Sequence, residues 1–393
     1  MAQPNLGKPQ PSSHTWVEPI VVIGIMIASC YINRQRRKPA DRGQGLFNRP
    51  NLDLEDEPNG SNIYDEQELL FFSVAESSWP TSHGRKSRLC CGFKLDTVNT
   101  SQFATHWHSR VLEKFPFLVE MFYWALNFSC YAAAKAVGET FFANGDVWQM
   151  AEKHGIAVLW FEQDGPFKFL FPFREVDVQH FFMSEHQGML TLLNRTYSLV
   201  HIPATVGFLG WYYYSAPTHS HFAAVRRMMT LTNILSFVIF TFWPCMPPRL
   251  LPKEYGFFDT VRREDAQSVW ASGKFFNQLA AFPSLHFGYA FCVGATLIFH
   301  SGVFRRQPGP RGKQWSRVRQ GVFVFLGVLY PAFVLTIIVA TANHYWLDAL
   351  AAAVVVALAW KCNRVLLGFL PLEDLFLWCI RLKKPFPTTG SRL

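Results

Sequence analysis

The stretch AAFPSLHFGYAFCVGATLIF, residues 280–299, decides the fold. The quartet Pro-Ser-Leu-His, residues 283–286, brings a serine and a histidine to the start of an otherwise apolar segment. The stretch contains no Asp, Glu, Lys or Arg. About 20 predominantly apolar residues suffice for a helix to cross the hydrocarbon core of a bilayer. We therefore interpret residues 281–299 as a transmembrane helix that begins at Pro283–His286. A histidine at that point is either an ordinary interfacial residue or part of a binding site.

The whole chain alternates apolar and polar blocks in the same way. Of its 393 residues, 50% are hydrophobic and only 17% are charged, which is typical of a membrane protein with several spans. The predicted fold class is an all-α, polytopic integral membrane bundle of about seven transmembrane helices. The expected spans are 16–32, 117–142, 189–214, 230–244, 281–299, 321–342 and 345–367.

The basic residues orient these spans. Short loops rich in Lys and Arg stay on the cytoplasmic side, and all four basic clusters fall on one side of the seven-span arrangement. They occupy residues 34–38, 226–227, 305–319 and 361–384. We expect the N-terminus outside and the C-terminus in the cytoplasm. The net charge of +9 then reflects loops that face anionic lipid, and it does not indicate a nucleic-acid partner.

The polar segments suggest a domain organisation. Residues 1–33 are expected to form a signal-anchor helix, and residues 34–115 a polar cytoplasmic linker that is largely disordered. Residues 116–370 form the membrane domain. Residues 371–393 are a cytoplasmic tail whose prolines argue against a helix. The eight cysteines show no spacing typical of a zinc site or a disulfide framework.

Polar residues from three parts of the chain are predicted to reach one membrane surface. The outward loop before residue 280 contains Arg249, and the fifth span begins with Ser284 and His286. The sequence TANHYWLDALAA, residues 341–352, places His344 and Asp348 between the last two spans. Ionisable residues at membrane helices are functional candidates by default, because their burial there is unfavourable. The convergence therefore predicts a site.

These residue types suit a phosphate ester at the bilayer surface. Arg249 offers a forked cationic donor. A proline at the first helical position would leave Ser284 and the free backbone N–H groups facing an anion.

A histidine and an aspartate four residues apart lie on one helical face. Asp348 could hold one nitrogen of His344 protonated and leave the other free to attack phosphorus. His286 could protonate the departing oxygen.

Three motifs carry a resemblance to a known family. WPCMPPRLLP (243–252), NQLAAFPSLH (277–286) and TANHYWLDA (341–349) resemble the type 2 phosphatidic acid phosphatase superfamily. More narrowly, they resemble its branch of fungal inositol phosphorylceramide synthase-like proteins. The upstream LLNRTYSLVHIPATVGFLGWYYY (192–214) looks like the same branch, so the resemblance covers about residues 117–370 and implies a six-helix core.

The resemblance implies roles for individual residues. His344 would be the nucleophile that forms a phosphohistidine, Asp348 its orienting partner and His286 the acid. Arg249 and Ser284 would bind phosphate. No metal or other cofactor would be needed. The partners would be membrane lipids, with a phospholipid donor and a lipid or water acceptor, in the Golgi or another endomembrane with the site on the lumenal face.

The chain also departs from the superfamily pattern. Ile338 stands where the broader pattern has Arg, so other cations of the outward loop are candidates to meet phosphate charge, namely Lys253, Arg262, Arg263 or Lys274. Asn277 in the same loop is a further candidate contact. Asn194 and His201 share one helical face, where they either pack or contact a head group.

Three functions remain open on the sequence alone. The first is a phosphotransferase or phosphatase that uses a phosphohistidine. The second is a metalloenzyme with His286, His344 and Asp348 as ligands, which leaves Arg249 unexplained because a cation beside a metal is unfavourable. The third is a non-catalytic lipid-binding relative. Whether the protein has protein partners is unknown from the sequence.

Overall fold

The computed structural model describes residues 17–36, 86–90, 93–141, 146–166, 168–260, 278–304 and 316–390. The regular secondary structure of these residues is helical apart from one antiparallel hairpin, β1 (Lys86–Cys90) with β2 (Phe93–Thr97), and an isolated bridge. The helices are α1 (Val17–Ile32), α4 (Trp107–Lys114), α5 (Leu118–Phe141), α6 (Val147–Gln163), α7 (Glu175–Glu185), α8 (Gln187–Leu199), α9 (His201–Ser215), α10 (His219–Phe242), α11 (Leu285–His300), α12 (Arg317–Ala340), α13 (Trp346–Cys362) and α14 (Leu370–Cys379). The expectation of a helical bundle is confirmed.

The chain divides into two compact units. The first comprises Met1–Ala28, Tyr123–Tyr212 and Ala224–Asn363, and the second comprises Ser29–Phe122, Tyr213–Ala223 and Arg364–Leu393. The second unit contains the hairpin, α4 and α14. Within it, Thr388 donates its backbone N–H to the Tyr213 hydroxyl at 3.4 Å and its hydroxyl to the Asn33 carbonyl at 2.8 Å.

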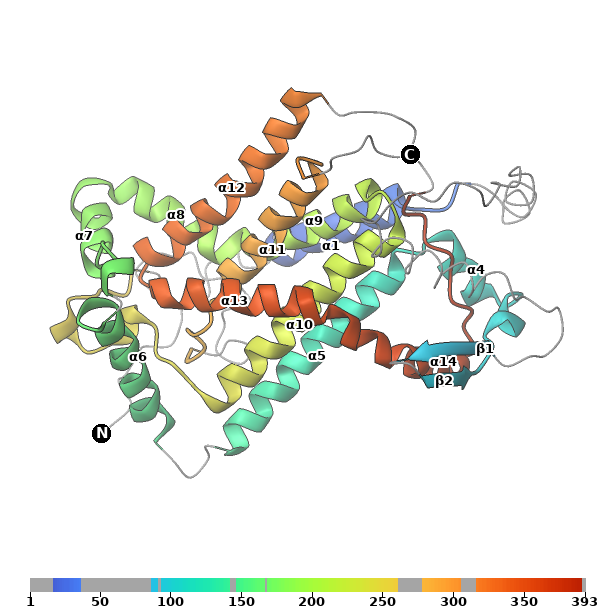
Figure 1. The fold of residues 1–393 in the computed structure, drawn as a ribbon, viewed down its shortest axis with the longest axis horizontal. Coiled ribbons are helices and arrows are strands. Elements are labelled where there is room, and N and C mark those ends of the chain that lie inside the picture. The colour runs from blue at the N-terminus through green and yellow to red at the C-terminus, as the bar shows by residue number, and fades with distance from the viewer. Residues whose placement is uncertain are drawn as a thin grey trace, which may run out of the picture. The chain divides into compact units, whose positions relative to one another are not determined.

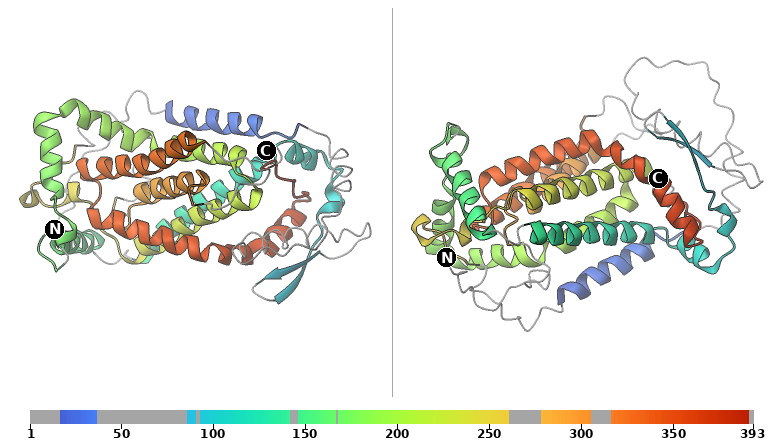
Figure 2. Two further views of the ribbon diagram at one scale, coloured as in Figure 1. Left: turned by 45° about the horizontal axis from the view of Figure 1, so that its top comes forward. Right: turned by 90° about the horizontal axis from the view of Figure 1, so that it is seen from below.

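The first unit holds every described residue of the predicted site. In it, α11 lies between α12 and α13 and packs against both, as Figures 1 and 2 show. Helices α7 and α8 pack against α12, and α6 packs against α13. Helices α6 and α7 thus lie at the end where α12 finishes and α13 begins (Figure 1). That end is where the site is found.

Two glycines let the backbones of α11 and α12 approach closely. A Cβ atom on Gly294 would overlap the Gly327 carbonyl oxygen and lie 3.0 Å from Pro331 Cγ. A Cβ atom on Gly327 would lie 2.6 Å from Ile298 Cγ1 and 2.8 Å from the Gly294 carbonyl oxygen. Small residues at a helix contact permit such an approach in membrane bundles.

Helices occur at all seven expected places, but two of the expected bounds were wrong. The predicted span 189–214 is interrupted at Val200 between α8 and α9. Pro203 explains the interruption, because proline lacks an N–H group and its ring clashes with the carbonyl four residues earlier, which is that of Leu199. The predicted span 230–244 begins eleven residues too late, since α10 starts at His219. The cationic Arg227 therefore lies within a helix rather than before it, where its Nε donates to Asn363 Oδ1 at 3.2 Å.

The polar flanks are also more structured than expected. Most of the predicted linker, 37–85, lies outside the described residues. Its remaining part contains the β1–β2 hairpin and α4. The expectation of a non-helical tail was wrong at its start, because residues 370–379 form α14. Pro371 stands at the beginning of this helix, where a missing N–H group is tolerated.

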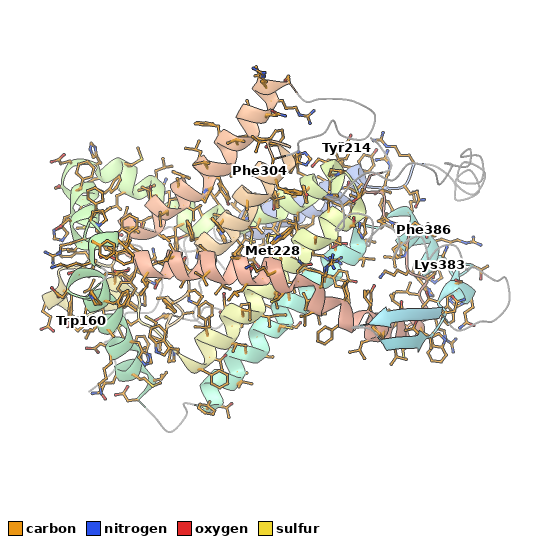
Figure 3. All side chains as sticks on the ribbon, viewed as in Figure 1. Trp160, Tyr214, Met228, Phe304, Lys383 and Phe386 are labelled. Atoms are coloured by element: carbon orange, nitrogen blue, oxygen red, sulfur yellow. The ribbon has the colours of Figure 1, made fainter. Side chains whose placement is uncertain are left out.

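Several helices are suited to a lipid environment. Within the described residues, three helical segments are long and apolar enough to cross a membrane, namely His219–Phe242, Arg317–Ala340 and Trp346–Cys379. Pro19–Ile32 and Leu285–His300 are apolar but shorter. Helix α12 exposes Val318, Phe325 and Val328 by 57–77%, and Figure 3 shows the exposed aromatic side chains of Trp160 on α6 and Phe304 after α11.

Replacing Gly294 by alanine is expected to destabilise the protein by about 1–3 kcal/mol, because the new methyl group overpacks the contact between α11 and α12. The measurement is thermal unfolding in detergent micelles. Gly321, on the exposed start of α12, has no atom within 4 Å of a built Cβ. Gly321→Ala is therefore the control, and it should raise stability by up to about 1 kcal/mol. Equal effects of the two changes would contradict the close contact.

Candidate active site

Backbone hydrogen bonds assemble three loops at the start of α11 and α13. The Arg249 amide donates to the Ala342 carbonyl at 2.9 Å, and the Ser284 amide donates to the Asp348 carbonyl at 3.1 Å. Cys245 and Ala280 form an isolated parallel β-bridge. The loops that carry Arg249, Ser284 and His344 are therefore held together by their main chains before any side chain is considered.

His344 has its ring fixed by two acceptors. Its Nδ1 lies 2.8 Å from the Ala281 carbonyl oxygen and 3.2 Å from Asp348 Oδ2. A carbonyl oxygen only accepts hydrogen bonds, so these partners assign the proton to Nδ1. The neutral ring then carries its free electron pair on Nε2. His344 is 4% exposed and Asp348 is fully buried.

Asp348 has a second partner at the start of its own helix. Its Oδ2 also accepts the Tyr345 backbone N–H at 2.9 Å, while its Oδ1 has no hydrogen-bond partner among the described residues. The carboxylate thus caps α13 and orients His344 with the same oxygen atom. The four-residue spacing predicted the contact with His344, but not the capping.

His286 lies next to His344 in a group of neighbouring aromatic rings. The centroids of the two imidazoles are 5.8 Å apart. Tyr197 stacks on His286 at 4.2 Å, and His201 lies 4.4 Å from it on the other side of the α8–α9 interruption. His201, a candidate from the sequence, is therefore next to the proposed acid.

Ser284 is the N-cap of α11. Its Oγ accepts the Phe287 backbone N–H at 3.3 Å, and the residue is fully buried. The expectation that Pro283 occupies the first helical position was wrong, because the helix begins at Leu285. A lone pair of the Ser284 hydroxyl accepts the Phe287 N–H, and the hydroxyl proton is left for donation to another acceptor.

Arg249 is 9% exposed and already has an anionic partner. Its Nη1 lies 3.1 Å from Asp259 Oδ2, and its Nε donates to Asn343 Oδ1 at 2.8 Å. Asn343 in turn donates from its Nδ2 to the Thr341 hydroxyl oxygen at 2.7 Å. The guanidinium is thus oriented by the residue that precedes His344, and a carboxylate occupies the position where a phosphate oxygen could bind.

The remaining candidates do not all join this group. Asn194 is 1% exposed and accepts the Thr260 hydroxyl at 3.3 Å, so it contacts the segment that carries Asp259. Lys253 is exposed on a short 3-10 turn, Lys253–Tyr255. Lys274 and Asn277 lie outside the described residues.

Among the residues that the structure describes, no group of three His, Cys, Asp or Glu side chains could hold a metal ion.

Two groups of residues near the site were not among the candidates from the sequence. Asn343 and Asp259 orient Arg249, and only the position of Asn343 beside His344 could have indicated this. Glu162 and Glu175 accept the backbone N–H groups of Leu347 and Trp346, at 2.5 and 3.4 Å. They come from α6 and α7, and no local sequence pattern links them to α13.

A sequence model of the PAP2 superfamily matches residues 169–306 and 313–362. The match supports the type 2 phosphatidic acid phosphatase superfamily. No curated protein and no solved structure matches the chain. The PAP2 match begins after α6 and ends with α13, so it includes Arg249, His286 and His344. The superfamily acts on lipid phosphates, and together with the candidate membrane helices the match indicates an integral membrane protein.

The contact between Arg249 and Asp259 predicts how the protein responds to inorganic anions. An anion that binds the folded state stabilises it by RT ln(1 + [L]/Kd), about 2.7 kcal/mol at a hundredfold excess over Kd. Phosphate or vanadate should raise the unfolding temperature of the parent protein. Arg249→Ala should diminish this rise, and Asp259→Asn should increase it, because a competing carboxylate is removed.

Arg317→Ala is the control for these variants, since Arg317 is exposed at the distant start of α12. The measurement is a thermal shift over a series of anion concentrations. An identical anion response in the parent and in both site variants would contradict an anion site at Arg249.

Proposed function

We propose that the protein transfers a phosphate-containing group from a phospholipid through a covalent phosphohistidine at His344. The coarser part, a lipid phosphatase or phosphotransferase type of function, is supported by the PAP2 superfamily match. The observation that carries the finer part is the 2.8 Å contact between His344 Nδ1 and the Ala281 carbonyl, because it leaves the free electron pair on Nε2. A histidine held in this way is suited to nucleophilic attack.

The proposed reaction has two balanced steps. In the first, His344 Nε2 attacks phosphorus, the bond from phosphorus to the lipid oxygen breaks, and His286 gives its proton to that oxygen. In the second, an acceptor hydroxyl attacks the phosphohistidine, the phosphorus–nitrogen bond breaks, and His286 takes the hydroxyl proton. The centroids of the two rings are 5.8 Å apart, so both imidazoles are close enough to contact one phosphate ester.

The other residues of the site would stabilise charge. Asp348 would stabilise the positive charge that develops on His344 as the new bond forms. Arg249 would bind the phosphate oxygens after its ion pair with Asp259 breaks. Ser284 would donate a hydrogen bond from its hydroxyl group to one of these oxygens. Metal chemistry enters none of these steps.

The proposed substrates follow from the resemblance to the inositol phosphorylceramide synthase branch. The donor would be phosphatidylinositol, and the acceptor the primary hydroxyl of a sphingolipid. The membrane domain would extend over residues 116–370, with residues 1–33 as its anchor. The site would face the lumen of the Golgi or another endomembrane, the side opposite to the basic loops.

We expect the purified protein, in mixed micelles with labelled phosphatidylinositol and ceramide, to form a labelled sphingolipid. A labelled water-soluble product that forms equally well without ceramide would indicate a lipid phosphatase instead. The absence of turnover on any labelled phospholipid would show a non-catalytic relative and overturn the proposal.

Two histidine variants in the same assay test the division of roles. His344→Ala should abolish turnover and covalent labelling, because the nucleophile is lost. His286→Ala should lower the rate with the natural lipid by about 10²–10⁴-fold, the usual contribution of a general acid. With an activated leaving group that needs no proton, His286→Ala should still accumulate labelled enzyme. Equal loss with both leaving groups would contradict the assignment of His286.

The proposed orientation predicts opposite accessibility of two exposed residues. Helix α12 has 24 residues and so spans about 36 Å, slightly more than the bilayer core of about 30 Å. In a background without reactive cysteines, Arg317→Cys should react with a membrane-impermeant thiol reagent only from the cytoplasm. Lys253→Cys should react only from the lumenal side. Labelling of both positions from one side would contradict this topology.

A further inference from the structure

The first turn of α13 is contacted by two buried carboxyl groups from other helices. Glu162, at the end of α6, accepts the Leu347 backbone N–H at 2.5 Å. Glu175, at the start of α7, accepts the Trp346 backbone N–H at 3.4 Å. Both glutamates are 1% exposed. The free amides at this helix start are thus satisfied by side chains that lie far away in the sequence.

The Oε2 atoms of both glutamates are buried and have no hydrogen-bond partner among the described residues. Burial, and next the neighbouring Glu175, raise the pKa of Glu162 well above its usual value. Of the other ionisable groups nearby, Asp348 on α13 raises it further, and Tyr345 and Cys245 also interact with Glu162. The raised pKa favours the protonated, uncharged form of the Glu162 carboxyl group.

We propose that Glu162 and Glu175 are positioning residues, which fix the first turn of α13 so that Asp348 remains aligned with His344. This inference rests on the proposed function, since it assigns the pair a part in the same reaction. Glu162 lies before the segment that matches the PAP2 superfamily, which begins at residue 169.

The mechanism is a competition for one carboxylate. The N–H groups of Tyr345, Trp346 and Leu347 all point out of the start of α13, and Asp348 Oδ2 already accepts the first of them at 2.9 Å. Without the glutamates, the other two amides would lose their partners in a part-buried position, which is unfavourable. Asp348 lies in the same helical turn, and a rotation of its carboxylate toward those amides would compete with its 3.2 Å contact with His344.

A role in packing alone would not need two acids. A buried ionic pair is often no more stabilising than apolar side chains of similar volume. Helix α13 also has a separate tether to the same region, because Trp346 Nε1 donates to the Phe173 carbonyl at 2.9 Å. The carboxyl groups are thus needed for the backbone amides next to the catalytic residues, rather than to hold α13 in place.

Two substitutions of Glu162 test the proposal. Glu162→Met keeps the length of the side chain but removes the acceptor. We expect it to lower kcat by about 10²-fold, the effect of a small misalignment of reacting groups, with little change in KM. Glu162→Gln keeps a side-chain oxygen that accepts the Leu347 N–H, so it should keep kcat close to that of the parent. Asp177→Asn, an exposed acid on the first turn of α7, is the matched control and should leave both constants unchanged.

Hydrogen exchange of the Trp346 and Leu347 amides provides a readout that does not depend on activity. These amides should exchange slowly in the parent and in Glu162→Gln, and faster in Glu162→Met. Fast exchange in the parent, or an unchanged kcat in a folded Glu162→Met, would overturn the proposal. A different result would be that neither the parent nor any variant turns over lipid, while the amides still exchange slowly in the parent and in Glu162→Gln and faster in Glu162→Met. In that case the proposed function fails, and the contacts of Glu162 and Glu175 with α13 remain as a structural feature.

Discussion

The buried start of α13 is the constraint on which the site depends. A helix begins with backbone N–H groups that have no partner within the helix, and here Tyr345 and Asp348 at that start are fully buried. The chain satisfies them with acids: Asp348 from the helix itself, and Glu162 and Glu175 from two others. One of these acids also orients His344. Helix termination and the alignment of the proposed nucleophile are therefore parts of one hydrogen-bond network.

Much of the fold could be predicted because apolar periodicity and span length are local properties of the sequence. The same local reasoning failed at Pro203, where a single ring divides one expected helix into α8 and α9. It also failed at the start of α10, because Arg227 finds a buried partner in Asn363 and therefore need not mark a helix end. Contacts of this kind join residues that are distant in the sequence, and hydropathy does not record them.

The site shows the same division. His344 and Asp348 could be paired from their spacing, and the membrane orientation brought His286 and Arg249 to the same side. The residues that orient them could not be found, because Glu162 and Asp259 contact the site only after distant loops fold together.

Ile338 stands where the superfamily pattern suggested a cationic side chain. It is fully buried in an apolar cluster, and its carbonyl accepts the amides of Asn343 and His344 at 3.0 and 3.2 Å. At this position the backbone, and not a cationic side chain, shapes the loop.

The ion pair between Arg249 and Asp259 has a consequence for where a substrate can compete. The carboxylate belongs to the same chain, so its effective concentration at the guanidinium is set by a short tether and is of millimolar order. A dilute anion in solution competes poorly against such a resident partner. A lipid headgroup confined to the membrane surface is itself concentrated in a thin layer. If Arg249 binds a lipid phosphate as proposed, the pair would favour ligands that the bilayer delivers over those that bulk water delivers.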